Sequence, residues 1–546
     1  MSQLFGSSDR ELNRGYHIAA GDRVPLVQKI AYGFGTTLDM WGNWLFPSLV
    51  WVAYNIYLGV PPWLISLALM VNRLADAVSD PFFGWISDNT RSRWGRRRPY
   101  ILVGSVLAGI CLPCLVWVSP GWGSTTILGQ VIPNYFWYMV VSSSLYITIV
   151  SCFNVPWQSL GSELTPDFHE RTSVFTIKTA VQKLPELGLF FAGAFSTSKV
   201  WSGADASMVF ERLGLMADRS WVWLGEFFGA LVRFDGSALY GHLTNLLGWA
   251  TPIEGVDAPV NSLLGAQVYT VILGSLMVVV GIGVFALVKE RYYNSVVVER
   301  KQERIKITET LWEVLKCRPF RANLSMAFAY AMGTAMVGTL GYYATIYYVC
   351  GGDVTVGSIW NTFMGLSNSG LGLVGVAFFA FFAKRWGKRA TMAMVQLSAI
   401  VVFIGTWWLY TPEIVWLQMF ASGLIAFTGA GFWMLYGSIG ADIIDYDELE
   451  NGKRREGAFT ACGSWIMKVG QAVGIGASGF VLSFTGFNAE LGANQTPEAL
   501  WNIRFYLAAI PVIGLVIALV MLSRFTLTQK ETMDIRTALE ARRGKV

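Results

Sequence analysis

Three charged side chains, Arg73, Asp76 and Asp80, lie deep in a strongly apolar stretch of the chain. Asp76 and Asp80 are four residues apart, so a helix places both carboxylates on one face, with Arg73 beside Asp76. Charges near the middle of a bilayer are costly, and we expect these to be buried, paired and functional. Paired carboxylates can bind sodium, or one can take up a proton because adjacent negative charges repel. The alternative is that Arg73 and Asp76 only hold helices together, which leaves Asp80 without a partner.

Lys468 is the sole charge in a long, glycine-rich apolar segment further along the chain. A lone lysine is not tolerated in lipid, so we expect it to point inward and pair with Asp76 or Asp80. A cation that enters the carboxylate pair would then compete with Lys468, which is a physical route to coupling.

Other polar groups in apolar segments could bind a polar solute. Asp39 could accept hydrogen bonds from it, or make a helix-packing contact instead. Asn154 and Gln158 flank a proline, and the distorted helix can present them to a wet cavity. Trp157 offers a flat face for a sugar ring, or it packs between helices. Lys178 lies near the start of its segment, where snorkelling is the alternative to a role in binding.

The composition is that of a polytopic helical membrane protein. Of the 546 residues, 53% are hydrophobic and 14% charged, against about 25% charged in soluble domains. Several apolar runs reach the roughly 20 residues that span a bilayer. The polar first 28 residues show no signal peptide. We expect no nucleic-acid partner, because the net charge of +5 is modest and the basic residues cluster between spans.

Enzymatic and ATP-driven functions find little support. The chain lacks a Walker loop and a nucleophile elbow. Its six cysteines show no metal-ligand spacing, and it has only three histidines. We expect no cofactor, and no metal beyond a possible sodium ion at Asp76 and Asp80.

Twelve spans are predicted, and the arginine-rich loop after the second places both termini in the cytoplasm. The spans are 28–58, 61–87, 99–120, 129–162, 173–198, 265–290, 319–349, 354–383, 390–410, 413–442, 457–485 and 500–525. They form two pseudo-symmetric halves, 29–290 and 319–525, between a cytoplasmic segment 1–28, a middle loop 291–318 and a tail 526–546. Within the first half, the insertion 199–264 is non-cytoplasmic. Its stretches 205–214 and 222–234 form surface helices or a loose loop, and a short helix is expected at Thr308–Leu315.

Charged residues between the spans are interpreted as a cytoplasmic gate of salt bridges that breaks and re-forms. The acidic run after span ten lacks the ligand pattern of a calcium loop, and basic residues follow it at once. The gate residues are Asp88, Arg93, Arg96, Glu170, Arg171, Asp442, Arg454 and Arg455.

Four stretches, residues 29–35, 73–84, 90–96 and 170–172, carry a resemblance to a known family, and 452–457 leading to Lys468 extends it. They resemble the glycoside–pentoside–hexuronide:cation symporters of the major facilitator superfamily, which include the melibiose permease. The resemblance spans nearly the whole chain apart from the insertion. It implies a twelve-helix all-α fold, alternating access and no enzymatic activity.

The resemblance assigns the coupling cation to Asp76 and Asp80, and places Ser79 and Ser151 where the family has two further cation ligands. It also assigns the family's lysine of span eleven to Lys468. The solute site departs from the pattern. Asn154 replaces the family's aspartate, the span-one aspartate falls on Met40 beside Asp39, the tryptophan of span four falls on Gln158, and the arginine of span five falls near Lys178.

The expected function is a symporter that imports a polar solute, a glycoside or related sugar, with a proton or sodium. Asp76 and Asp80 bind the cation, while Lys468 and Arg73 couple the halves. We expect a monomer in a bacterial inner membrane, with the bilayer and a small-molecule solute as its partners. The alternative is a carrier of lysolipids or other amphiphiles, because lysolipid carriers of animals resemble the same family.

Overall fold

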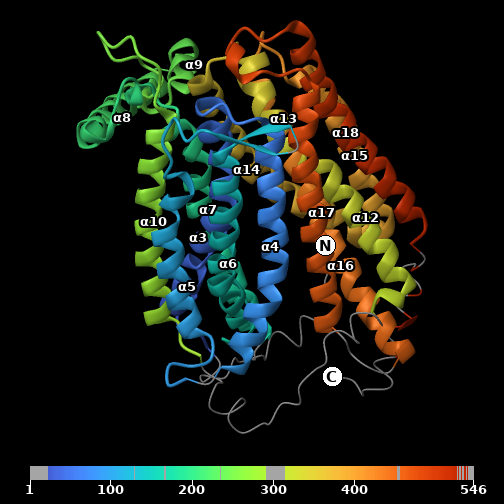
Figure 1. The fold of residues 1–546 in the computed structure, drawn as a ribbon. Coiled ribbons are helices and arrows are strands. Elements are labelled where there is room, and N and C mark those ends of the chain that lie inside the picture. The colour runs from blue at the N-terminus through green and yellow to red at the C-terminus, as the bar shows by residue number, and fades with distance from the viewer. Residues whose placement is uncertain are drawn as a thin grey trace.

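Two groups of helices stand side by side in the computed structural model, α2–α10 and α12–α18 (Figure 1). The structure describes residues 23–90, 92–127, 129–164, 168–233, 235–290, 314–451 and 456–525, together with positions 527, 531, 534, 535 and 538. We call the end that carries α8 (Val209–Val232) and α9 (Gly236–Thr244) the insertion end. The opposite end, where residues 92–97 lie, is the arginine-loop end.

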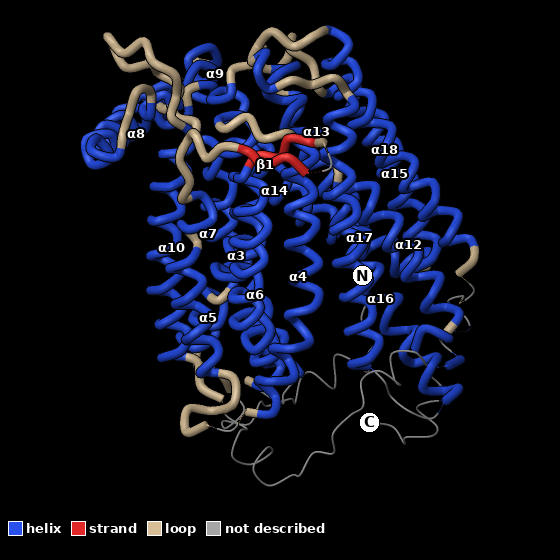
Figure 2. Tube along the Cα trace, viewed as in Figure 1, coloured by secondary structure: helices blue, strands red, loops and turns tan. Residues whose placement is uncertain are grey.

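Long helices run between these two ends in both halves (Figure 2). The first half contains α2 (Leu26–Phe34), α3 (Thr36–Val50), the π-helical turn η1 (Trp51–Tyr57), α4 (Pro62–Asn89), α5 (Arg98–Cys111), the 3₁₀ turn η2 (Pro113–Val116), α6 (Asn134–Glu163), α7 (Phe168–Ser196) and α10 (Ser262–Leu287). The second half contains α12 (Arg318–Ala335), α13 (Val337–Tyr343), the π-helical turn η7 (Ala344–Val349), α14 (Val354–Trp386), α15 (Lys388–Leu409), α16 (Leu417–Asn451), α17 (Glu456–Phe484) and α18 (Pro497–Ser523).

Several helices at the insertion end begin at side-chain caps. Asn261 accepts a hydrogen bond from the Leu264 amide at the start of α10, and Asp353 accepts one from the Val356 amide at the start of α14. Such caps satisfy amide groups that have no partner within the first turn. The starts of these spans are therefore encoded locally.

Close helix contacts depend on glycine. A Cβ atom at Gly109 of α5 or at Gly274 of α10 would overlap the carbonyl oxygen of the other glycine. Without side chains at these positions the two backbones come close, as small residues allow in membrane bundles.

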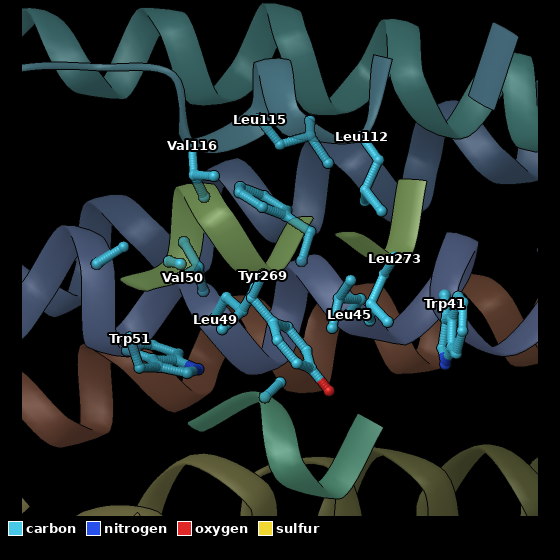
Figure 3. Close-up of a cluster of buried hydrophobic side chains, with 14 of the residues drawn as sticks. Trp41, Leu45, Leu49, Val50, Trp51, Leu112, Leu115, Val116, Tyr269 and Leu273 are labelled. Atoms are coloured by element: carbon cyan, nitrogen blue, oxygen red, sulfur yellow. The ribbon is translucent and has the colours of Figure 1, made fainter. Parts of the chain in front are cut away.

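Part of the apolar core lies between α3, the end of α5, η2 and α10 (Figure 3). Leu45 and Leu49 of α3 face Leu112 and Leu115 across this core, and Tyr269 of α10 fills the space beside them. This packing holds α3 firmly, and α3 carries Asp39.

The first span of each half shares an irregularity that the sequence pattern does not reveal. The first is divided into α2, α3 and η1, and its counterpart into α12, α13 and η7. Both finish in a π-helical turn, a feature often found at functional sites. The two turns meet, because the Tyr343 hydroxyl, just before η7, donates to the side-chain oxygen of Asn55 in η1.

An all-α membrane architecture is what the structure shows, with some differences in detail. Nine helices among the described residues are long and apolar enough to cross a membrane. The count of twelve stays a prediction, because the α2–η1 segment, α4 and α7 do not reach that level of hydropathy. α4 and α7 carry several charges within their length.

Three expectations about local structure are wrong. Residues 129–133 do not begin a span, because strands β1 (Ser124–Ile127) and β2 (Gln130–Pro133) form an antiparallel hairpin there. The acidic run after span ten is helical, since α16 continues to Asn451. The insertion forms one long helix, α8 (Val209–Val232), followed by α9 (Gly236–Thr244), instead of two short helices or a loose loop.

Some expectations fall largely on residues outside the described ranges. They are the segment 1–28, the middle loop with its helix at Thr308–Leu315, and the tail 526–546.

Polar contacts close the molecule at the insertion end. In the described residues, the hydrogen bonds and ion pairs that join the two halves lie between this end and the level of Lys468. The Ser66 and Ser478 hydroxyl oxygens lie 3.3 Å apart, and Lys199 Nζ is 3.2 Å from Asp353 Oδ2. The others join Asn55 to Tyr343, Thr197 to Thr355, Phe190 to Thr362, Glu186 to Ser369 and Asp76 and Asp80 to Lys468.

The closed insertion end predicts a reversible cross-link. Combining Ser66→Cys with Ser478→Cys places two thiols within bonding reach across the halves. Oxidation should form the disulfide and stop transport, and reduction should restore it, because the halves can no longer separate there. The two single variants are the controls. A double variant that is fully cross-linked yet transports normally would show that this end never opens.

Candidate functional site

The lysine of α17 lies between the two aspartates of α4. Lys468 Nζ is 2.9 Å from Asp76 Oδ2 and also contacts Asp80 Oδ2. Asp76 is almost completely buried, whereas 30% of the Asp80 side chain is exposed. The predicted ion pair between the halves is therefore present, and it joins α4 of the first half to α17 of the second.

Arg73 completes a cluster of four charges. Its Nη1 lies 3.8 Å from Asp76 Oδ2, and the residue is only 4% exposed. Two cations and two carboxylates sum to a neutral group, so no charge in the cluster is left uncompensated.

Two serines surround the carboxylates. Ser151 of α6 donates to Asp76 Oδ1 at 3.4 Å, and its hydroxyl lies 2.8 Å from that of Ser79. Both serines are buried. The four residues expected to bind the cation are thus close together, with hard oxygen atoms from α4 and α6 directed at one place. Oxygen ligands of this kind suit sodium, and a carboxylate among them can hold a proton.

A second polar group connects α3 with α6. Asn154 Nδ2 donates to Asp39 Oδ1 at 2.9 Å, and Gln158 Nε2 donates to Asn154 Oδ1 at 3.1 Å. Gln158 is exposed, while Asn154 and Asp39 are partly buried. This ladder therefore runs from an accessible amide to an inner carboxylate, an arrangement that suits the hydroxyl groups of a polar solute.

Asn43, which the sequence pattern did not single out, connects the two groups. Its Nδ2 donates to Asp39 Oδ1 at 3.1 Å, and its carbonyl oxygen accepts from Arg73 Nη2 at 2.8 Å. The Arg73 guanidinium also lies 4.7 Å from the centre of the Trp44 ring, a favourable cation–π distance. The available signal was spacing, because Asn43 is a polar residue four positions after Asp39 in an apolar helix.

Trp157 packs inside the bundle, which is the alternative to stacking on a sugar. It is fully buried, its Nε1 donates to the Tyr32 carbonyl at 3.1 Å, and its ring stacks on Phe153. The Lys178 ammonium lies 4.7 Å from the ring centre. A side chain at Gly35 would overlap the indole. The expected direct contact of Trp157 with solute is therefore not available in this conformation.

Glu186 of α7 accepts a hydrogen bond from the other half, a contact that the sequence pattern did not predict. Its Oε2 accepts from Ser369 of α14 at 2.8 Å, and it forms an ion pair with Lys183 at 2.8 Å. A carboxylate near a proline in a span was the available signal.

The described gate residues contact groups of their own half. Lys388 Nζ of α15 is 2.6 Å from Asp442 Oδ2 of α16, and the Arg93 guanidinium lies 5.0 Å from the Trp94 ring centre. The backbone amide of Arg96 donates to Glu290 at 3.0 Å. Arg454 and Arg455 lie outside the described residues, and the side chains of Asp88, Glu170 and Arg171 do as well. The gate stays a prediction.

Comparison with known proteins identifies the family. A family model described as MFS/sugar transport protein, where MFS is the major facilitator superfamily, matches residues 30–529. The chain belongs to this family. It is therefore a multi-pass integral membrane transporter and not an enzyme, and the resemblance found in the sequence motifs is confirmed.

Relatives of this transporter differ in what their names say they carry. An isoprimeverose transporter of Lactiplantibacillus pentosus is 25% identical over 90% of this chain and 86% of its own length. The sodium-dependent lysophosphatidylcholine symporter 1-B of Danio rerio is 21% identical over 88% of this chain and 83% of its own.

A solved structure shares the fold of this transporter. The crystal structure of a D-xylose–proton symporter superimposes with a TM-score of 0.53, at 11% sequence identity, over 91% of this chain and 96% of that one.

The charge cluster predicts a defined stability change. Lys468→Met removes the cation that Asp76 and Asp80 share. Arg73 then remains beside Asp76, and Asp80 loses its counter-charge. The loss of stability should fall somewhat below the roughly 3–5 kcal/mol of fully buried pairs, because Asp80 retains solvent contact. Thermal unfolding of the purified protein measures it.

A compensating variant serves as the matched control. Adding Asp80→Asn to Lys468→Met removes one of the unpaired charges, so most of the lost stability should return. Equal unfolding temperatures for the wild type and Lys468→Met would contradict an energetic role for the ion pair.

Proposed function

We propose that this transporter is a symporter that couples the uptake of a polar solute, a glycoside or related sugar, to a proton or sodium ion. The observation that carries the proposal is the position of Lys468, which is shared by Asp76 and Asp80 across the interface of the halves. The sugar transporter among the relatives supports the solute class.

Coupling rests on competition for the two carboxylates. A proton or sodium ion that binds Asp76 and Asp80 replaces the Lys468 ammonium as their counter-charge. The ion pairs that join Lys468 of α17 to α4 are then broken, and the equilibrium between the conformations in which the halves do and do not touch there is shifted. A ligand shifts such an equilibrium only by binding one state better, and this competition supplies that difference. Ser79 and Ser151 provide further oxygen atoms for either cation.

The solute binds along the ladder of Asp39, Asn154 and Gln158. Bound hydroxyl groups compete for the hydrogen bonds that these side chains now make with one another. Lys178 contributes a cation beside them, and Trp157 positions Lys178. Because Asn43 contacts both Asp39 and Arg73, a change at the solute ladder reaches the charge cluster through one residue.

The second candidate is a carrier of lysolipids or other amphiphiles, which the lysophosphatidylcholine symporter among the relatives favours. An amphiphile needs an apolar compartment for its chain and a lateral opening. The hydrogen-bonding ladder is a better match for a solute that is polar throughout, so we place the sugar first.

The orientation and location are part of the proposal. The arginine-loop end and both termini face the cytoplasm, as the five arginines of residues 91–98 favour. The insertion faces outward from a bacterial inner membrane. In this orientation the structure corresponds to a state closed toward the outside. The gate residues would then form their contacts across the halves in the opposite state.

Carboxylate-to-amide variants test the coupling. Asp76→Asn or Asp80→Asn should abolish concentrative uptake while exchange of solute persists, because an amide neither takes up a proton nor balances a cation. The measurement follows external pH on de-energised cells as glycosides are added singly, with and without sodium. Alkalinisation identifies proton symport, and uptake stimulated by sodium without a pH change identifies sodium symport.

Asp257→Asn, an exposed position in the insertion, is the matched control and should transport normally. If both cluster variants concentrate solute as the wild type does, the cation site lies elsewhere. Transport of lysolipids with no response to any glycoside would establish the second candidate instead.

Asp39→Ala tests the solute ladder separately. Loss of a hydrogen bond to a charged group costs about 1.5–3 kcal/mol, or roughly ten- to hundredfold in solute affinity. The KM for solute should rise accordingly, while transport still requires the coupling cation because Asp76 and Asp80 are intact. Ser48→Ala, an exposed residue of the same helix, is the control. An unchanged KM would remove Asp39 from the solute site.

A further inference from the structure

Helix α8 carries an apolar stripe that nothing in the described structure covers. Four large side chains on it are strongly exposed: Phe210 by 88%, Trp221 by 74%, Phe228 by 58% and Val232 by 78%. The exposed small residues Gly214, Ala217 and Gly225 lie between them. These seven positions are spaced by three or four residues throughout, so they form one continuous line along the helix.

The opposite face of α8 is packed. Met216, Trp223 and Ala230 are buried, and Trp223 Nε1 donates to the His242 carbonyl at 2.9 Å. Arg219 Nη1 donates to the backbone carbonyl of Thr251, in the loop beyond α9, at 2.5 Å. The stripe is therefore presented by a helix whose other side is fixed to the insertion.

The polar flank of α8 is acidic. Glu211, Asp218 and Glu226 are all exposed and lie to one side of the stripe. Arg212 is buried and Arg219 binds carbonyl groups, while Arg233, one residue past the helix, is exposed and donates from Nε to the Gly229 carbonyl at 3.2 Å. The three exposed carboxylates therefore outnumber the exposed arginine. The charge on the exposed polar face of α8 therefore does not favour binding to negatively charged headgroups.

Helix α8 lies near a surface of the bundle that faces lipid. Helix α10 spans the membrane and exposes Val271, Leu276 and Val279 to it. The 3₁₀ turn η3 (Lys199–Trp201) contacts both α8 and α10, which places α8 beside the insertion end of that span. Figure 1 shows α8 running across the direction of the spans and projecting beyond α10. A helix at this level, running across the spans, has the position of an interfacial helix.

We propose that α8 is an interfacial anchor whose apolar stripe is inserted into zwitterionic phospholipid at the insertion end. The acidic flank faces water, and aromatic residues of the stripe occupy the boundary region that suits such side chains. Burial of apolar surface supplies the affinity, so insertion is independent of anionic lipid. The partner of this surface is the bilayer around the transporter, not its transported solute.

Site-directed spin labelling of the full chain in phosphatidylcholine nanodiscs tests this. Ala217→Cys, on the stripe, and Asp218→Cys, on the flank, are labelled one at a time after the six native cysteines are replaced. The ratio of collisions with oxygen to collisions with a nickel chelate should be several-fold higher at 217 than at 218. Phe228→Cys and Glu226→Cys should repeat this difference.

Equal ratios at the stripe and flank positions would overturn the proposal. Replacing half of the phosphatidylcholine by phosphatidylglycerol should leave the ratios unchanged, and a strong dependence on anionic lipid would contradict an apolar anchor. In nanodiscs that hold one copy of the protein, a second copy cannot cover the stripe. If the stripe is shielded only in discs with two copies, and the labels broaden each other's spectra, a second copy of the chain covers it and not lipid.

Discussion

The cost of placing charge inside an apolar bundle governs this structure. Asp76 and Asp80 on one half are balanced by Lys468 on the other, with Arg73 beside them. Each charge alone would strongly destabilise the bundle, and together they are neutral. Because the counter-charges come from both halves, the ion pair can exist only while α4 and α17 are in contact. The cluster is therefore neutral only when the two halves are in contact at this level. A cation that replaces Lys468 at the carboxylates keeps them neutral without that contact.

The remaining contacts between the halves fit around that constraint. The Ser66–Ser478 and Lys199–Asp353 contacts close the insertion end, whereas Asp442 pairs with Lys388 inside its own half. A transporter that alternates between two states needs one set of contacts to be made while the other is broken. Most of the closing contacts are single hydrogen bonds made by hydroxyl groups, which can be exchanged at low energetic cost.

Much of the candidate site could be predicted because membranes simplify the reasoning. An ionisable residue in an apolar segment must find a partner, so the sequence alone pairs Lys468 with the aspartates. The same rule does not apply to uncharged or aromatic residues. The sequence pattern does not single out Asn43, and it leaves open whether Trp157 stacks on a solute or packs between helices. In the structure Trp157 packs between Tyr32, Phe153 and Lys178. Whether an indole faces a cavity or a core depends on neighbours from other helices.

The sequence by itself determined that the chain is a helical membrane transporter, because hydropathy, spacing and charge cost are local properties. It also determined which charges must meet. Only the tertiary structure decided how they meet, that Asn43 connects the solute ladder to Arg73, and that residues 124–127 pair with residues 130–133. The tertiary structure also decided that α8 is one helix with an uncovered stripe. The geometry of the ion pair and the Asn43–Arg73 contact depend on segments far apart in the chain, and local pattern carries no information about distance in space.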